Sequence, residues 1–260
     1  MRINYEKIWA GIKYEYLVFG SEDFIVYIDK DLDVDWETTR EWDESGPIDT
    51  NEHHFILNEQ ARIETIPFEG LNKEKIVHFK RLLGEALART FEHEYGYARQ
   101  SLQAAENYIK ERSSEVSRYW YLSSSLLTAS IFIFSFILGW IFRNILENVF
   151  GNHFNEVLMV CSLGSVGALL SIILRIGKES LDSSSGQRLL RLEGISRILA
   201  GCLSGLLAMF AFNAGILFPT LVNETNHLWG LGLISFISGI SERFVPSLVT
   251  KFESLQNKSK

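Results

Sequence analysis

The second half of the chain is dominated by four apolar stretches of similar length. They cover residues 121–142, 157–174, 198–218 and 228–249. Each is close to the ~20 residues with which an α-helix crosses the ~30 Å hydrocarbon layer of a bilayer. The pattern predicts a bundle of four membrane-spanning helices.

Basic residues are distributed unevenly among the segments that flank these stretches. The segment between the first and second stretches contains a single Lys or Arg residue, Arg143, and residues 219–227 contain neither Lys nor Arg. Basic side chains next to a span are retained in the cytoplasm. They gather before the first stretch, between the second and third, and after the fourth: Lys110, Arg112, Arg118; Arg175, Lys178, Arg188, Arg191, Arg197; Lys251, Lys258, Lys260. Both termini are therefore expected in the cytoplasm.

Short apolar runs separated by turn residues predict a small α+β domain at the N-terminus. Strands are expected at residues 14–19 and 24–28, joined by a polar turn, and again around residues 54–57 and 62–66. A core this small needs support from the next segment or from a neighbouring subunit. The expected core residues are Trp9, Tyr16, Phe19, Ile25, Tyr27, Phe55 and Ile63.

Residues 72–118 contain no proline and have apolar or small side chains every three or four positions, which predicts one long helix. Asn72 is a suitable N-cap. Gly84 and Gly96 are the points at which a bend is expected. Nothing before residue 121 stops this helix from continuing into the first span. Whether it folds back on the N-terminal domain or pairs with copies of itself stays open.

The predicted organisation has four parts. These are a cytosolic α+β domain over residues 1–71, a connecting helix over 72–120, a transmembrane bundle over 121–250 and a cytosolic tail over 251–260. Within the bundle, residues 143–156 are too polar to span a bilayer and too apolar for a simple loop, so a short interfacial helix is expected. Residues 177–194, with their Ser-Ser-Ser-Gly sequence, are expected to form a loop.

Charge separates the two halves of the chain. The formal net charge is −7, but residues 1–72 alone carry −11 and the remainder +4. An acidic domain without a basic stripe is poorly suited to bind nucleic acid or anionic lipid, so no nucleic-acid partner is expected. Cys161 and Cys202 both fall inside predicted spans, which favours a packing role over a disulfide or a zinc site.

Small residues mark the predicted contacts between the spans. Gly201 and Gly205 stand four residues apart in the third span, and Gly164 and Gly167 offer a matching face in the second. In hydrocarbon, helices associate chiefly where small residues let their backbones approach closely. The pattern predicts tight helix packing, either within one subunit or between subunits.

Three polar residues in the spans are candidates for a gate or a latch. Glu242 and Arg243 are adjacent in the fourth stretch, and Asn213 lies in the third. Ionisable side chains inside a membrane are costly and are usually paired or face water. The alternative is that Glu242 and Arg243 lie at the cytoplasmic interface, where an arginine reaches the headgroups.

The remaining polar clusters do not indicate catalysis. Asp29, Asp31, Asp33 and Asp35 alternate as on one face of a strand, but tryptophans occupy the positions at which a calcium loop needs glycine and glutamate. A solvated sheet edge is the favoured interpretation. No zinc spacing of histidines and no phosphate-binding glycine loop occurs. We therefore expect no catalytic residue, no cofactor and no metal site.

The arrangement of a cytosolic N-terminal domain, a long helix and four C-terminal spans resembles the membrane effectors of bacterial anti-phage defence operons. The sequence of residues 239–246, Gly-Ile-Ser-Glu-Arg-Phe-Val-Pro, is similar to the end of the last span in many bacterial membrane proteins. The resemblance implies an oligomer in the bacterial inner membrane. A partner protein or small ligand at the N-terminal domain would trigger the spans to breach the bilayer. A non-conducting membrane scaffold and a small channel or transporter are the alternatives.

Overall fold

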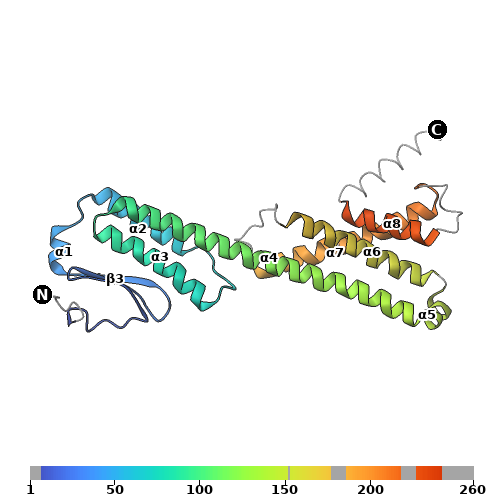
Figure 1. Cartoon of the computed structure of the whole chain (residues 1–260), viewed down its shortest axis with the longest axis horizontal. Helices are drawn as coiled ribbons and strands as arrows, with labels where there is room; N and C mark the ends of the chain where they lie inside the picture. Colours follow the sequence, from blue (N-terminus) through green and yellow to red (C-terminus); the bar gives the residue numbers. More distant parts are fainter. Residues whose placement is uncertain (1–6, 152, 177–185, 218–226, 242–260) are drawn as a thin grey trace. The chain divides into compact units, whose positions relative to one another are not determined.

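The computed structural model describes residues 7–151, 153–176, 186–217 and 227–241. They form two compact units, one of residues up to Val116 and one of residues from Ser117 onward. Figure 1 gives the order of the elements along the chain. The N-terminal unit combines a small sheet with helices, and the C-terminal unit is a helix bundle.

The sheet has three antiparallel strands in sequential order, β1 (Tyr16–Gly20), β2 (Phe24–Ile28) and β3 (Val34–Thr38). The first two lie where the sequence predicts them. The Asp29 carboxylate accepts hydrogen bonds from the backbone N–H groups of Asp31 (2.9 Å) and Asp33 (2.8 Å), which closes a tight turn between β2 and β3. The four aspartates therefore do not line one strand face: Asp29, Asp31 and Asp33 belong to the turn, and Asp35 lies in the edge strand β3.

Two strands predicted around residues 54–57 and 62–66 are helical instead. After the short helix α1 (Arg40–Ser45), residues Thr50–Glu64 form α2. Asp49 caps α2 by accepting from the N–H groups of Asn51 and Glu52. The buried residues of α2 recur every three or four positions, which is the period of a helix: His53, Ile56, Gln60 and Ile63. Each apolar run by itself was too short to reveal that period.

The predicted continuous helix is broken into α3 (Lys73–Phe91) and α4 (Tyr95–Ile141). Between them His93 adopts a left-handed conformation with φ of 61°, which ends α3 and reverses the chain. Neither predicted bend, Gly84 or Gly96, lies at this break. Gly84 serves packing, because a Cβ there would lie 3.0 Å from Val18 Cγ2 of β1.

The chain folds back at this turn, so α3 and the first part of α4 run antiparallel. The His78 and Tyr108 ring centroids are 4.8 Å apart, and Lys75 Nζ lies 3.7 Å from the Glu115 carboxylate. Of the expected core residues, Ile25 and Ile63 are buried, whereas Tyr16 and Phe55 are exposed. The core instead joins β2, β3, α2, α3 and α4 through a larger set: Phe24, Val26, Ile28, Val34, Ile56, Ile63, Phe79, Leu83, Ala86, Leu87, Ala88, Phe91, Ala98, Leu102, Ala105 and Ile109.

The C-terminal unit contains the rest of α4 together with α5 (Arg143–Phe150), α6 (Phe154–Arg175), α7 (Gln187–Asn213) and α8 (His227–Ile240). The short helix α5 forms within the segment predicted for it. The predicted loop over residues 177–194 is wrong in its last part, since α7 begins at Gln187. The reason is packing: Leu190, Gly194 and Ile198, four residues apart, are all buried.

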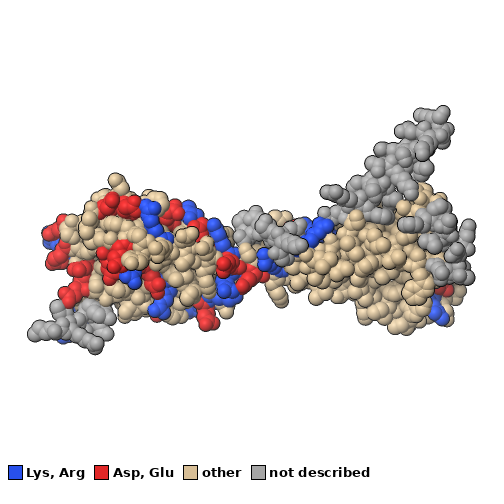
Figure 2. All heavy atoms as spheres, turned by 45° about the horizontal axis from the view of Figure 1, so that its top comes forward, with Lys and Arg blue, Asp and Glu red and all other residues tan. Residues whose placement is uncertain are grey.

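Three helices, α4, α6 and α7, are long and apolar enough to cross a membrane. The apolar helix α8 is shorter, and the part of the fourth predicted span beyond Ser241 lies outside the described residues. Figure 2 shows charged side chains spread over the N-terminal unit and almost none over the visible middle of the bundle. This is the surface of a multi-pass membrane protein.

Candidate functional site

Glycines bring α6 and α7 into backbone contact. A Cβ added to Gly201 would lie 2.8 Å from the Gly164 carbonyl oxygen and would overlap the Ala168 methyl group. A Cβ on Gly205 would lie 2.9 Å from the Val160 carbonyl oxygen. Gly164, Gly201 and Gly205 thus meet within one chain, and helix association in hydrocarbon depends on such close approach.

The same face of α6 also contacts α8. A Cβ added to Gly239 would meet the Gly164 carbonyl oxygen, and one on Gly167 would lie 3.1 Å from the Ile240 backbone nitrogen. Gly167 therefore packs against α8 and not, as the sequence suggested, against the third span. The sequence reasoning missed Gly239 as a packing residue, although its neighbour Ser235, four residues earlier, is also small and buried.

A third close contact joins α4 to α7. Gly194 lies against the first span, where an added Cβ would be 2.7 Å from both the Ser125 hydroxyl and the Tyr121 carbonyl oxygen. The sequence analysis assigned Gly194 to a loop and missed this role. A signal was available, because Gly194, Gly201 and Gly205 are seven and four residues apart and so share one helix face.

Serine hydroxyls buried in the bundle bond to their own helices. Ser165 donates to the Ser162 carbonyl oxygen at 2.7 Å, Ser235 to that of Leu231 at 2.7 Å, and Ser238 to that of Ser235 at 2.7 Å. Such bonds satisfy the hydroxyl without a partner from another helix. These serines act as small packing residues.

A cavity of about 280 Å³ lies among α6, α7 and α8. Ser171, Arg197 and Ser204 contribute polar side chains to it. Arg197 lies 3.4 Å from the Glu193 carboxylate and over the Tyr121 ring, 5.7 Å from its centroid. The charge of Arg197 is thus compensated within the bundle.

The candidate gate residues are not brought together by the described structure. Asn213 is the last residue of α7, its side chain is exposed, and its Oδ1 lies 3.2 Å from His227 Nε2 at the start of α8. Asn213 thus lies at the end of its helix, beside the start of α8. Glu242 and Arg243 lie outside the described residues.

Arginines concentrate at one end of the bundle. This is the end at which α4 enters, α6 ends and α7 begins, and its described arginines are Arg118, Arg175, Arg188, Arg191 and Arg197. At the opposite end, where α5 lies, the described charged residues are Arg143, Glu147 and Glu156. A concentration of basic residues at one end is the pattern expected of a bundle with a defined orientation in the membrane.

Ion pairs connect the helices of the N-terminal unit. The buried Lys80 ammonium of α3 lies 2.6 Å from the Glu64 carboxylate of α2 and 3.2 Å from that of Asp33. Arg62 bonds both oxygens of Glu106, at 3.2 and 3.0 Å, and so links α2 to α4. Hydrogen bonds from Arg62 and Lys110 lower the pKa of Glu106 to about 2.

Within the described ranges, no group of three or more His, Cys, Asp or Glu side chains is placed to hold a metal ion. No protein-family model, no curated protein and no solved structure matches the chain. The geometry of the helix contacts and the charges of the N-terminal unit are therefore the basis for assigning a function.

Proposed function

We propose that the chain is an effector of the bacterial inner membrane, with both termini in the cytoplasm and four spans. Its N-terminal unit receives a cytosolic signal, from a partner protein or a small ligand. Its bundle responds by changing its helix packing and permeabilising the bilayer. The biological setting that we propose is anti-phage defence, with the protein acting as a homo-oligomer.

The observation that carries this proposal is the continuity of α4. This helix of 47 residues supplies Ala98, Leu102, Ala105 and Ile109 to the core of the N-terminal unit. Further along, the same helix supplies Tyr121 and Ala129 to a buried cluster with Ala168 and Ile198 of the bundle. A change in the packing of α2 or α3 on α4 therefore acts directly on a helix that is part of the bundle.

The charge distribution supports the orientation. The arginine-rich end of the bundle includes Arg118, which directly precedes the apolar part of α4. Basic ends remain in the cytoplasm. The N-terminal unit, which precedes Arg118 in the chain, is then cytoplasmic and accessible to a cytosolic signal.

The glycine contacts support a bundle with more than one packing. Backbone-to-backbone contacts at Gly164, Gly201 and Gly239 involve few interlocking side chains. Helices that meet over small residues can shift by about a helical turn or less and find another close contact. Such a shift is the event that we assign to permeabilisation.

Membrane potential is the direct test. Cells expressing the chain with its operon partners should depolarise when the signal is given, as followed by a potential-sensitive dye. A matched strain should express Gly201→Leu, which blocks the α6–α7 contact, and should keep its potential. Growth arrest with an unchanged potential in the unsubstituted strain would rule out permeabilisation.

The scaffold alternative is separated by exchanging the bundle. Replacing residues 121–250 with an unrelated four-span anchor should abolish the response if the bundle is the effector. A chimera that retains full activity would show that the spans serve only to anchor the N-terminal unit.

A further inference from the structure

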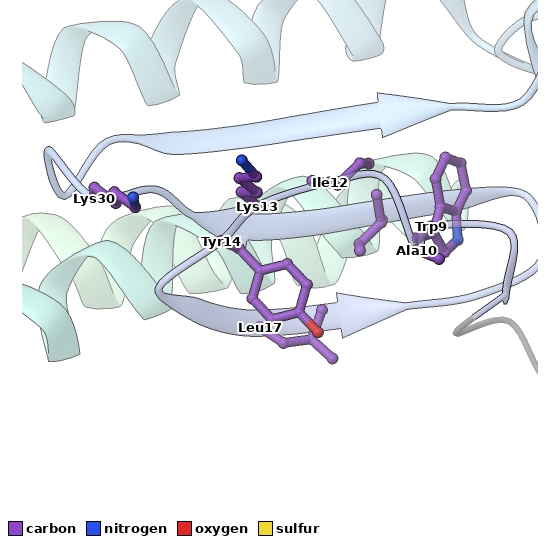
Figure 3. A pocket seen from close by; sticks show the side chains of 8 residues that line it. Trp9, Ala10, Ile12, Lys13, Tyr14, Leu17 and Lys30 are labelled. Carbon is purple, nitrogen blue, oxygen red and sulfur yellow. The ribbon is translucent and has the colours of Figure 1, made fainter.

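The N-terminal unit has a pocket on the face of the sheet that points away from α3. Along β2, Phe24, Val26 and Ile28 belong to the core shared with the helices, whereas Ile25 points the other way. Ile25 is nevertheless only 2% exposed, and it lines a pocket together with residues of the segment that precedes β1. Figure 3 shows this segment, which carries Trp9, Ile12 and Tyr14, running across the sheet. The space beneath this segment is a pocket of about 480 Å³.

The wall of this pocket is held at both ends. Trp9 Nε1 donates a hydrogen bond to the Ser21 carbonyl oxygen at 2.8 Å, and the Ile12 N–H donates to the Trp9 carbonyl oxygen at 3.0 Å. Beyond the crossing, the Glu15 N–H donates to the Ile28 carbonyl oxygen at 2.9 Å. The pocket is therefore preformed, and its volume is in the ~300–1,000 Å³ range of small-molecule sites.

Two lysines line this pocket, and neither makes an ion pair with any residue that the structure describes. Elsewhere in the unit, each lysine and arginine from Arg40 to Arg112 has a carboxylate within 4 Å: Arg40, Arg62, Lys73, Lys75, Lys80, Arg81, Arg89, Arg99, Lys110 and Arg112. The described exceptions are Lys7, Lys13 and Lys30, and the last two both line the pocket.

Lys30 follows Asp29 in the turn between β2 and β3, and the two side chains make no ion pair. Asp29 Oδ1 instead accepts hydrogen bonds from the backbone N–H groups of Asp31 and Asp33. On the same sheet face, the acidic residues Asp35 and Glu37 belong to β3, opposite Tyr27 and Ile25 in register. Neither acidic residue is among those that line the pocket, whose charged lining residues are Lys13 and Lys30.

Aromatic and apolar surface inside the pocket is left accessible. Tyr14 is 43% exposed and Leu17 is 38% exposed, and both line the pocket together with Trp9. Figure 3 shows the Tyr14 ring beside Leu17, with Lys13 and Lys30 on the side away from Trp9. A flat apolar group fits against such a surface, and the positive charges of the two lysines attract an anionic group.

We propose that this pocket binds a small organic anion in which a planar ring carries a phosphate or carboxylate group. The ring lies against Tyr14 and Leu17, and Lys13 and Lys30 bind the anionic group. That this ligand is the signal for the bundle rests on the proposed function; its binding does not.

Calorimetric titration of the full chain in detergent tests the proposal with three compounds. 1-Naphthyl phosphate carries both ring and charge, 1-naphthol only the ring, and inorganic phosphate only the charge. Naphthyl phosphate should saturate one site per chain, and the other two should bind at least about tenfold more weakly. Equal affinity for inorganic phosphate, or no saturation by naphthyl phosphate below roughly 10 mM, overturns the proposal.

Lysine substitutions provide the matched control. Lys13→Ala and Lys30→Ala should each weaken binding about fivefold or more, and both positions are exposed, so the circular dichroism spectrum should not change. Lys7→Ala removes the third unpaired lysine, which does not line the pocket, and should leave affinity unchanged. An equal loss of affinity with Lys7→Ala would show that binding depends only on the net charge of the chain, and this result would contradict the proposal.

Recording membrane potential in the same variants separates the two proposals. Binding that needs Lys13 and Lys30 supports the pocket even if cells never depolarise, and in that case the effector function fails alone. Depolarisation without binding of naphthyl phosphate has the opposite meaning: the pocket inference fails and the effector function stands.

Discussion

At the scale of single residues, His53 shows how burial creates sensitivity to pH. His53 is only 7% exposed, and its Nδ1 has no hydrogen-bond partner among the described residues. Its ring centroid lies 5.9 Å from that of Trp42 and 5.8 Å from that of Phe91. Burial first, and then the positive charges of His54 and His93, lower the pKa of His53. The folded unit therefore favours the neutral form of this histidine.

Acid should loosen α2 for this reason. When the folded-state pKa of a histidine lies below its ordinary value of 6.5, the unfolded chain binds the proton more readily. The contribution of His53 to the free energy of unfolding is then fully present above about pH 6.5 and decreases as the pH falls toward the folded-state pKa. Amide hydrogen exchange in α2, corrected for intrinsic rates, should be faster at pH 5.5 than at pH 7.5.

His53→Phe should remove most of this difference, because a phenyl ring fills the same space without a proton to bind. His153→Gln changes an exposed histidine outside the N-terminal unit and is the matched control. Acid sensitivity that persists in His53→Phe would assign the effect to another group.

The Arg62–Glu106 pair should contribute measurably to stability, because it joins two helices and is made by two hydrogen bonds. Glu106→Gln should lower the free energy of unfolding by about 1 kcal/mol. Since the pKa of Glu106 is depressed to about 2, this contribution is present above about pH 4.5 and is lost as pH falls toward 2.

Glu44→Gln is the matched control for that substitution. Glu44 pairs with Arg40 within one short helix, and the Arg40 side chain is 88% exposed. Such pairs contribute little. Urea unfolding followed by hydrogen exchange in α2 and α4 should show a loss for Glu106→Gln only; equal losses would mean that the link between helices is unimportant.

At the scale of elements, the helices of the bundle pack through glycines at positions where there is no room for a larger side chain. At Gly201 even a methyl group would overlap Ala168 and the backbone of Gly164. At Gly230 of α8 the nearest atom to an added Cβ is Phe212 Cζ at 3.4 Å, which is an ordinary contact. Two glycines of the same bundle thus differ in the space available.

Gly201→Ala should therefore destabilise the bundle by about 1–3 kcal/mol through overpacking. Gly230→Ala should be neutral or slightly stabilising, since alanine favours a helix by up to about 1 kcal/mol over glycine. Unfolding of the detergent-purified protein by sodium dodecyl sulfate, followed by circular dichroism, measures both. Equal sensitivity of the two variants would contradict the α6–α7 contact.

At the scale of the whole molecule, the decisive feature is that one helix belongs to both units. Insertions between Arg118 and Tyr119, at exposed positions of α4, test whether rotation is transmitted through it. Two added alanines turn the following residues by roughly 200°, and four turn them by roughly 400°, which nearly restores the original phase.

The two-residue insertion should abolish signal-dependent depolarisation, and the four-residue insertion should retain part of it. Membrane potential in cells is the measurement, and equal protein levels in membranes are the control. If both insertion variants depolarise equally when the signal is given, the rotational phase of α4 does not transmit the signal.

Much of the molecule follows from local sequence pattern. Apolar length and the position of arginines indicated α4, α6 and α7, and short apolar runs joined by a polar turn indicated β1 and β2. Gly164, Gly201 and Gly205 were recognisable as packing residues, because small residues on one face of a helix let helix backbones approach closely in hydrocarbon. These features depend on residues close together in the chain.

Local sequence pattern gave wrong predictions where contacts between residues distant in the chain determine the structure. The sequence around Phe55 and Ile63 is compatible with strand or helix, and packing on α3 selects α2. The break at His93 follows because the reversed chain buries Ala98, Leu102 and Ile109 against α3, which compensates a left-handed residue without glycine. Likewise Gly194, in a segment with loop composition, is helical because it contacts Tyr121 and Ser125.

The sequence by itself determined that several helices are long and apolar enough to cross a bilayer and which of their faces carry small residues, because length, hydrophobicity and residue size are local properties. Only the tertiary structure decided that the long helical segment reverses at His93. It alone brought Lys13 and Lys30 to one pocket without an ion pair among the described residues. Those outcomes depend on which distant surfaces meet, and that choice is made by the free energy of packing the whole unit.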